Sequence, residues 1–226
     1  MKEIDRNNKM TLSDIAYSYI KRAILSLEFK PGSLLVEEEL SELLSISRTP
    51  IRTALQKLSH EGLVIFGSKS TRVKELSPKS FLEIFDLREA LEHLAIRDAT
   101  IKRKPEDLVK LRALYEEQKW LLNKDKIAGR SFLDIDSEFH FTIAESSYNS
   151  LLVKYMTDIN QSFIRYLYYT DFQYRTTNVI NEHGLILEAI EKQDIETAQK
   201  IMEEHLKGVK DSIMIALIQN MSEPLI

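Results

Sequence analysis

Four residues in the second half of the chain are spaced so that they could bind one metal ion together. Asp136 and His140 lie four residues apart in an expected helix, so both project from the same helix face. His183 and His205 each lie eleven residues from Asp194, where a tight turn joins two expected helices. Residues equidistant from such a turn sit level in an antiparallel pair, whose axes lie about 8–10 Å apart. Two inward imidazoles at that distance can share one ion.

One carboxylate and three imidazoles suit a borderline divalent cation such as Zn²⁺, Ni²⁺, Mn²⁺ or Fe²⁺, and zinc is the ion expected in purified protein. Apolar neighbours such as Phe139, Ile186 and Ile201 favour an inward direction for these side chains. The same spacing is also typical of buried histidines that only make hydrogen bonds. The chain has no cysteine, which excludes disulfides, thiol catalysis and cysteine-based zinc sites.

Arg88 and Asn149 are candidates for binding a small ligand. Arg88 falls in an otherwise apolar helical stripe, and a buried guanidinium needs a partner. That partner is either Glu92, one turn further along, or the carboxylate of a ligand, which arginine can hold through two hydrogen bonds. Asn149 either hydrogen-bonds the same ligand or caps the helix that follows it.

The first part of the chain carries a basic segment that could contact DNA. Arg48 and Arg52 share one face at the start of an expected helix, and arginine there can grip a guanine edge or a phosphate. Thr49 and Thr53 could add phosphate or methyl contacts. The alternative is a pair of solvated arginines on an amphipathic helix.

Charge is distributed unevenly over the 226 residues, whose net charge is −4. Residues 1–75 hold twelve basic and ten acidic side chains, whereas residues 76–226 hold nineteen and twenty-five. A small basic region on an acidic protein predicts one local contact with a polyanion. The sequence shows neither a signal peptide nor an apolar stretch long enough for a membrane span, so we expect a cytoplasmic protein without membrane contacts.

The pattern predicts a mainly α protein of two domains, 1–76 and 77–226, with the boundary at Ser77-Pro78. In the first domain, three helices over 12–27, 37–44 and 47–59 precede two strands over 63–66 and 72–76, which is the order of a winged helix-turn-helix module. The second domain is expected to be an all-α bundle of six helices. Their expected ranges are 78–103, 105–125, 130–147, 150–169, 178–192 and 195–220.

The first domain resembles the GntR family of bacterial transcription regulators. The matching residues are Phe29-Lys30-Pro31-Gly32, Leu35, Glu37, Leu40, Leu43, Ser47 to Arg52, Ala54-Leu55, Leu58 and Glu61 to Val64. The resemblance implies that Arg48 and Arg52 read bases and that the hairpin around Lys69, with Arg72, is a wing on the DNA. Many relatives have a glycine late in the wing and another in the turn before the recognition helix. This chain has Ser70-Thr71-Arg72 and Leu44-Ser45-Ile46 there.

The second domain resembles the FCD effector-binding domain of FadR-type GntR regulators, in the shorter VanR-type group. The matching residues are Phe81, Leu87-Arg88, Leu91-Glu92, Asp136 to His140, Asn149, Glu182-His183, Ala189-Ile190, Ala198 and His205-Leu206. The resemblance implies that Asp136, His140, His183 and His205 bind a divalent metal ion. It also makes repression that the ligand relieves the commoner expectation, with activation as the alternative. We expect the ligand to be a small carboxylate that completes the coordination of the metal and pairs with Arg88.

Two other functions fit the same residues. A metal-dependent hydrolase or lyase could use the Asp/His site, although it would need a nearby base, and Glu138 and Glu182 adjoin the ligands on helices that point them elsewhere. A DNA-binding protein with a purely structural metal is the second alternative.

We expect the protein to bind an inverted-repeat operator as a dimer. One winged module offers too few base contacts for useful specificity, and a second copy doubles them. Sedimentation of the free protein should give about twice the chain mass of 26.3 kDa. A strict monomer at micromolar concentration, both free and on DNA, would contradict this assembly.

Overall fold

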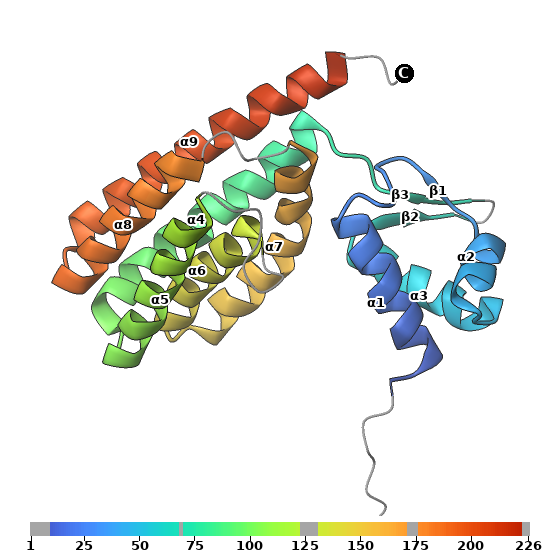
Figure 1. Ribbon diagram of the computed structural model, residues 1–226, viewed down its shortest axis with the longest axis horizontal. Coiled ribbons are helices and arrows are strands. Elements are labelled where there is room, and N and C mark those ends of the chain that lie inside the picture. Colours follow the sequence, from blue (N-terminus) through green and yellow to red (C-terminus); the bar gives the residue numbers. More distant parts are fainter. Residues whose placement is uncertain (1–9, 68–69, 123–130, 171–175, 223–226) are drawn as a thin grey trace, which may run out of the picture. The chain divides into compact units, whose positions relative to one another are not determined.

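The computed structural model describes residues 10–67, 70–122, 131–170 and 176–222 (Figure 1). It divides into two compact units, Met1–Leu76 and Ser77–Ile226. Helices dominate both units, and the described strands all belong to the first unit. The expected fold class, a winged helix-turn-helix module joined to an all-α bundle, is confirmed.

The first unit packs three helices against a small antiparallel sheet. In chain order the elements are α1 (Leu12–Leu25), β1 (Leu34–Leu35), α2 (Glu37–Leu44), α3 (Arg48–His60), β2 (Val64–Phe66) and β3 (Thr71–Val73). The sheet order is β1-β3-β2, with Arg72 opposite both Leu34 and Ile65. The sequence predicted only the hairpin and missed β1, because two residues are too few to show a strand's alternation.

Turns of unusual backbone geometry join these elements. Gly32 has a φ of +80° and the Ser33 amide donates to the Lys30 carbonyl at 3.1 Å, as in a type II turn with Pro31 and Gly32 at its centre. Ser45 has a φ of +54°, so a serine adopts the left-handed conformation just after α2. Ser47 is the N-cap residue of α3 and has an extended backbone, but its side chain makes no capping hydrogen bond.

The second unit contains the six expected helices among its described residues. They are α4 (Pro78–Lys102), α5 (Pro105–Leu121), α6 (Phe132–Ser146), α7 (Ser150–Tyr169), α8 (Thr176–Lys192) and α9 (Ile195–Ser222). α4 packs against α6, α7 and α9, whereas α5 packs against α6 and α8. Figure 1 shows α8 and α9 side by side as an antiparallel hairpin. No helix in the described part of the chain is long and apolar enough to cross a membrane.

The interior of the bundle changes in character along α4. At its first turns, Phe81 and Phe85 pack against Phe163 and Tyr166 of α7, with ring centroids 5.2–6.4 Å apart. One to two turns further, Arg88 and Glu92 point into the same interior and are buried. Burying charged groups in a helical core is unfavourable unless they are paired, so this stretch marks a site that the apolar core surrounds.

Candidate functional site

The three histidines singled out from spacing meet in the interior of the bundle. His140 lies on α6, His183 on α8 and His205 on α9, and each is at most 3% exposed. One ring nitrogen from each lies within 4.8 Å of the others. Asp136 is also buried, with its Oδ1 3.8 Å from Nε2 of His183. The structure therefore gathers the three predicted histidines into one group that could hold an ion, with Asp136 beside His183.

The Nδ1 atom of each imidazole faces an oxygen at the edge of the cluster. His183 Nδ1 lies 2.9 Å from Gln118 Oε1, and His205 Nδ1 lies 2.7 Å from Glu182 Oε2. His140 Nδ1 lies 3.1 Å from Glu92 Oε1, without the alignment of a full hydrogen bond. Since these oxygens only accept, they favour the tautomer that carries its proton on Nδ1.

In that tautomer the Nε2 atoms present lone pairs to one another. His140 Nε2 and His205 Nε2 are 3.3 Å apart. His183 Nε2 is buried and has no hydrogen-bond partner among the described residues. A tetrahedral ion with bonds of about 2.0–2.1 Å would hold two ligand nitrogens about 3.3–3.4 Å apart, so the donor set fits a metal ion.

The charges around the cluster also favour a cation. Three carboxylates, those of Glu92, Asp136 and Glu182, surround the histidines, while the nearby positive partner is Arg88. Burial lowers the pKa of His183 well below its usual value, and the neighbouring histidines and Arg88 lower it further. Burial also lowers the pKa of His205 against the opposing effect of Glu182. Both rings are therefore neutral, which is the form that coordinates a metal.

Glu92 connects Arg88 to the histidine cluster. Its Oε1 accepts from Arg88 Nε at 3.2 Å and lies 3.1 Å from Arg88 Nη2. Burial alone would raise the pKa of Glu92, but His140 and Arg88 outweigh this effect and hold the pKa at about 2. The guanidinium carbon of Arg88 lies 3.8 Å from the ring centroid of Phe163. Arg88 thus has the intramolecular partner that the sequence offered, and its Nη1 makes no hydrogen bond among the described residues.

Asn149 acts as the cap of α7 in this structure. Its Oδ1 accepts from the Leu152 amide at 3.2 Å. Of the two roles that the sequence left open, this geometry supports the cap, and a contact with a ligand stays a prediction.

Two outer contacts of the cluster were not expected from the sequence. Gln118 lies on the inner face of α5, in line with Leu111, Leu114 and Leu121. A polar amide within that apolar stripe was the sequence signal that could have identified Gln118 as a residue of the site. Glu182, which we expected to point away from the site, reaches across the α8–α9 hairpin to His205. Predicting this contact requires the register of the two helices in the hairpin, because Glu182 and His205 are 23 residues apart in the sequence.

The predicted DNA-contacting residues lie mostly at the start of α3. Arg48, Thr49, Arg52 and Thr53 are exposed there, while Ile51, Ala54, Leu55 and Leu58 are buried on the opposite face. The Thr53 hydroxyl donates to the Thr49 carbonyl at 3.1 Å. Arg72 is exposed on β3 and donates to the Gly32 carbonyl at 3.1 Å. Lys69 lies outside the described residues.

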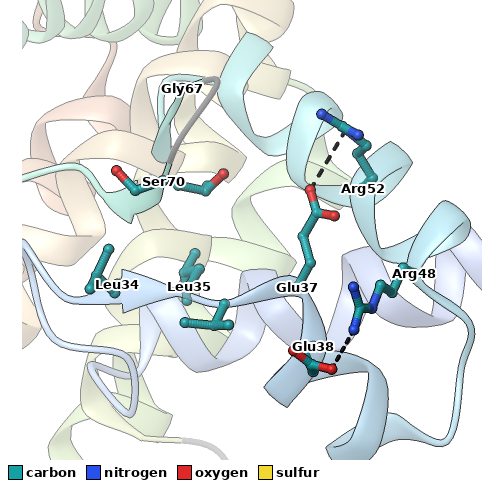
Figure 2. A pocket seen from close by; sticks show the side chains of 10 residues that line it. Leu34, Leu35, Glu37, Glu38, Arg48, Arg52, Gly67 and Ser70 are labelled. Carbon is teal, nitrogen blue, oxygen red and sulfur yellow. Dashed lines mark hydrogen bonds and ion pairs between the residues drawn. The ribbon is translucent and has the colours of Figure 1, made fainter.

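Both arginines of α3 make ion pairs with the first turn of α2. Arg48 Nη2 contacts Glu38 Oε1, and Arg52 Nε lies 3.6 Å from Glu37 Oε1 (Figure 2). The sequence analysis did not anticipate these pairs. They line a surface groove of about 430 Å³ between α2, α3 and the sheet.

A winged helix-turn-helix unit with two arginines at the front of its recognition helix defines a class of DNA-binding protein. Residues 12–73 match the family of bacterial regulatory proteins known as the gntR family, and residues 83–208 match the FCD domain. The chain therefore belongs to the GntR family of transcription regulators and carries an FCD domain.

Individual proteins agree with this assignment. The chain is 32% identical to the Nta operon transcriptional regulator of Aminobacter aminovorans over 152 residues, which cover 67% of this chain and 70% of that regulator. It is 28% identical to the Uxu operon transcriptional regulator of Escherichia coli (strain K12) over 218 residues, which cover 86% and 84%.

Solved structures share the fold. E. coli McbR/YncC aligns with a TM-score of 0.75 and 22% identity over 94% of this chain and 100% of that one. A GntR regulator from Rhodococcus sp. RHA1 aligns with a TM-score of 0.75 and 18% identity over 90% and 98%. The family and these relatives are transcription regulators and not enzymes, so the metal-dependent enzyme considered from the sequence is set aside.

The exposed arginines of α3 generate a prediction for DNA binding. Arg48→Ala and Arg52→Ala should each weaken operator binding by about 1–3 kcal/mol, because each removes a side chain able to hold a guanine edge or a phosphate. Gel-shift or fluorescence titration at one fixed salt concentration measures the loss. Thermal unfolding should be nearly unchanged, since both side chains are more than half exposed. Specific binding that survives the double substitution would contradict the assignment.

Proposed function

We propose that this regulator is a dimeric, ligand-responsive repressor whose FCD domain binds a divalent metal ion and a small organic acid. In this proposal the winged modules of two chains occupy an inverted repeat, and the acid releases them from the DNA. The FCD domain, the buried histidine cluster and the neighbouring arginine support the proposal.

The observation that carries the metal is the direction of the three imidazoles. Their Nδ1 atoms face Glu92, Gln118 and Glu182, and their Nε2 atoms converge. Without a cation, the buried Nε2 of His183 has no hydrogen-bond partner among the described residues, and an unsatisfied polar atom in a dry interior costs about 1–3 kcal/mol. A divalent ion converts this unfavourable arrangement into coordinate bonds.

His140, His183, His205 and Asp136 would hold the ion. Three nitrogens and one oxygen are a donor set that Zn²⁺, Ni²⁺, Mn²⁺ and Fe²⁺ accept, and zinc is the ion we expect after purification. The carboxylates around the cluster would offset the positive charge of the ion.

Arg88 is proposed to hold the carboxylate of the effector. It is buried within the bundle beside Glu92, which contacts Nε and Nη2 and leaves Nη1 as a donor. A small acid that also completes the coordination of the metal would be held at two points. Asn149 remains a weaker candidate contact, since its oxygen caps α7.

α4 is proposed to transmit the effect of the ligand. It carries both Arg88 and Glu92 and begins at Pro78, directly after the first unit ends at Leu76. An effector that changes the position of α4 would change the placement of the DNA-binding unit, and effector and DNA would be linked as two ligands of one equilibrium.

Replacing a ligand histidine tests the metal site. His183→Ala should lower the metal content of the purified protein and weaken its response to a carboxylate, because one of four ligands is lost. DNA binding without effector should change much less, since the site lies in the other unit. His93→Ala is the matched control, because His93 lies on α4 outside the cluster and should keep full metal content.

Elemental analysis and a thermal-shift screen of small carboxylates make these measurements. Wild-type protein that takes up no divalent ion at neutral pH would contradict the metal site. Loss of folding on metal removal would favour the purely structural metal, whereas loss of the effector response alone would favour the regulatory one.

The outer contact of His183 generates a separate prediction. Gln118→Leu removes the acceptor that holds the Nδ1 proton, and such outer contacts typically contribute about 10–100-fold to metal affinity. Competition with a chromophoric chelator measures the change. Gln118→Glu keeps an acceptor oxygen and should retain tight binding. Equal affinities for the leucine variant and the wild type would show that Gln118 does not orient His183.

A further inference from the structure

Acidic residues face the predicted DNA-reading arginines. The first turn of α2 holds Glu37, Glu38 and Glu39 in sequence, and two of them pair with arginines of α3. Figure 2 shows the Glu38 and Arg48 side chains pointing toward each other across the groove between the two helices.

The stability of the fold does not explain the Glu38–Arg48 pair. The two side chains are 62% and 61% exposed, and exposed ion pairs contribute about 0–1 kcal/mol. Nor does the helix dipole single out Glu38. Acidic residues in a first turn are favourable in general, and the neighbouring Glu39 supplies the same charge without an ion pair among the described residues.

A carboxylate on this surface should weaken DNA binding. It repels phosphates and partly neutralises an arginine that would otherwise attract them, which lowers the sequence-independent part of the affinity. In exchange, a guanidinium held by one carboxylate has fewer accessible rotamers. Recognition of guanine O6 and N7 needs a defined direction of the guanidinium, so orientation contributes to discrimination between bases.

We propose that Glu38 is a positioning residue that fixes the direction of Arg48 and thereby sets the selectivity of this regulator at the base pair that Arg48 reads. The proposal rests on the proposed operator binding through α3. Glu38 lowers the affinity for all DNA and raises the difference between the preferred base pair and the other three. It does so through Arg48 and needs no base contact of its own.

Glu37 and Arg52 are a looser version of the same arrangement. Their closest atoms are 3.6 Å apart, and the Arg52 guanidinium also lies 5.9 Å from the ring centroid of Phe66. Two side chains, Glu37 and Phe66, therefore restrict the Arg52 guanidinium, whereas Arg48 is paired with Glu38. The effect on selectivity should be larger for Glu38.

The test compares three full-length variants with the wild type. Glu38→Ala removes the charge and the contact, Glu39→Ala removes the same charge from the next residue, and Glu38→Asp keeps the charge on a shorter side chain. Each protein selects binders from a pool of random-sequence duplexes. Affinities are then measured for the wild-type selected duplex, its single-base-pair substitutions and a duplex without the selected motif, all at one salt concentration. Arg48→Ala identifies the base pair that depends on Arg48.

Glu38→Ala should lose about threefold to tenfold of the discrimination at the base pair identified by Arg48→Ala, a part of the 1–3 kcal/mol typical of a bidentate contact. It should also bind the duplex without the motif more tightly. Glu39→Ala should strengthen binding to all duplexes by one common factor. Glu38→Asp should lose discrimination without the gain in non-specific affinity.

Two results would overturn the proposal. If Glu38→Ala and Glu39→Ala change all affinities by the same factor, Glu38 acts only through its charge. If the discrimination is lost at a base pair that Arg48→Ala does not affect, Glu38 does not act through Arg48. Failure of the wild type to select any motif would be a different result, which would overturn the operator binding itself.

Discussion

Buried imidazoles that present their Nε2 atoms to one another are the constraint on which the second unit depends. An outer oxygen lies beside the Nδ1 atom of each ring: Glu92 of α4 beside His140, Gln118 of α5 beside His183 and Glu182 of α8 beside His205. Glu92 in turn requires the Arg88 guanidinium, which packs over Phe163. A single polar cluster thus connects five of the six described helices of the second unit, and a change at one member alters the surroundings of the others.

The DNA-binding unit uses charge in the opposite way. Its core is apolar, and the ion pairs of Arg48 and Arg52 lie on the surface, where the structure depends little on them. The buried pairs of the bundle, by contrast, cannot be separated without leaving a charge unpaired. Arginine therefore has a different setting in each unit: Arg48 and Arg52 are exposed beside carboxylates, and Arg88 is buried against Glu92.

Much of this arrangement could be predicted from the chain. Helix ranges agree within a few residues because proline marks where a helix begins, as at Pro78 and Pro105. The level placement of His183 and His205 followed from their equal distance to the turn at Asp194, and their ring centroids are 4.9 Å apart. The sequence analysis missed strand β1 because its pairing with β3 is a long-range contact, and a strand of two residues shows no pattern from which to predict it.

The sequence by itself determined which side chains are available and which helix faces carry them, because period and turn position are local properties. Only the tertiary structure decided their partners. The same local reasoning left Arg88 with two possible partners and Asn149 with two possible roles. In the structure Arg88 pairs with Glu92 and Asn149 caps α7. Gln118 meets His183, and Glu38 meets Arg48, only because separate helices pack at one particular register. Such contacts depend on how the helices pack against each other. The spacing of residues within one helix does not contain that information.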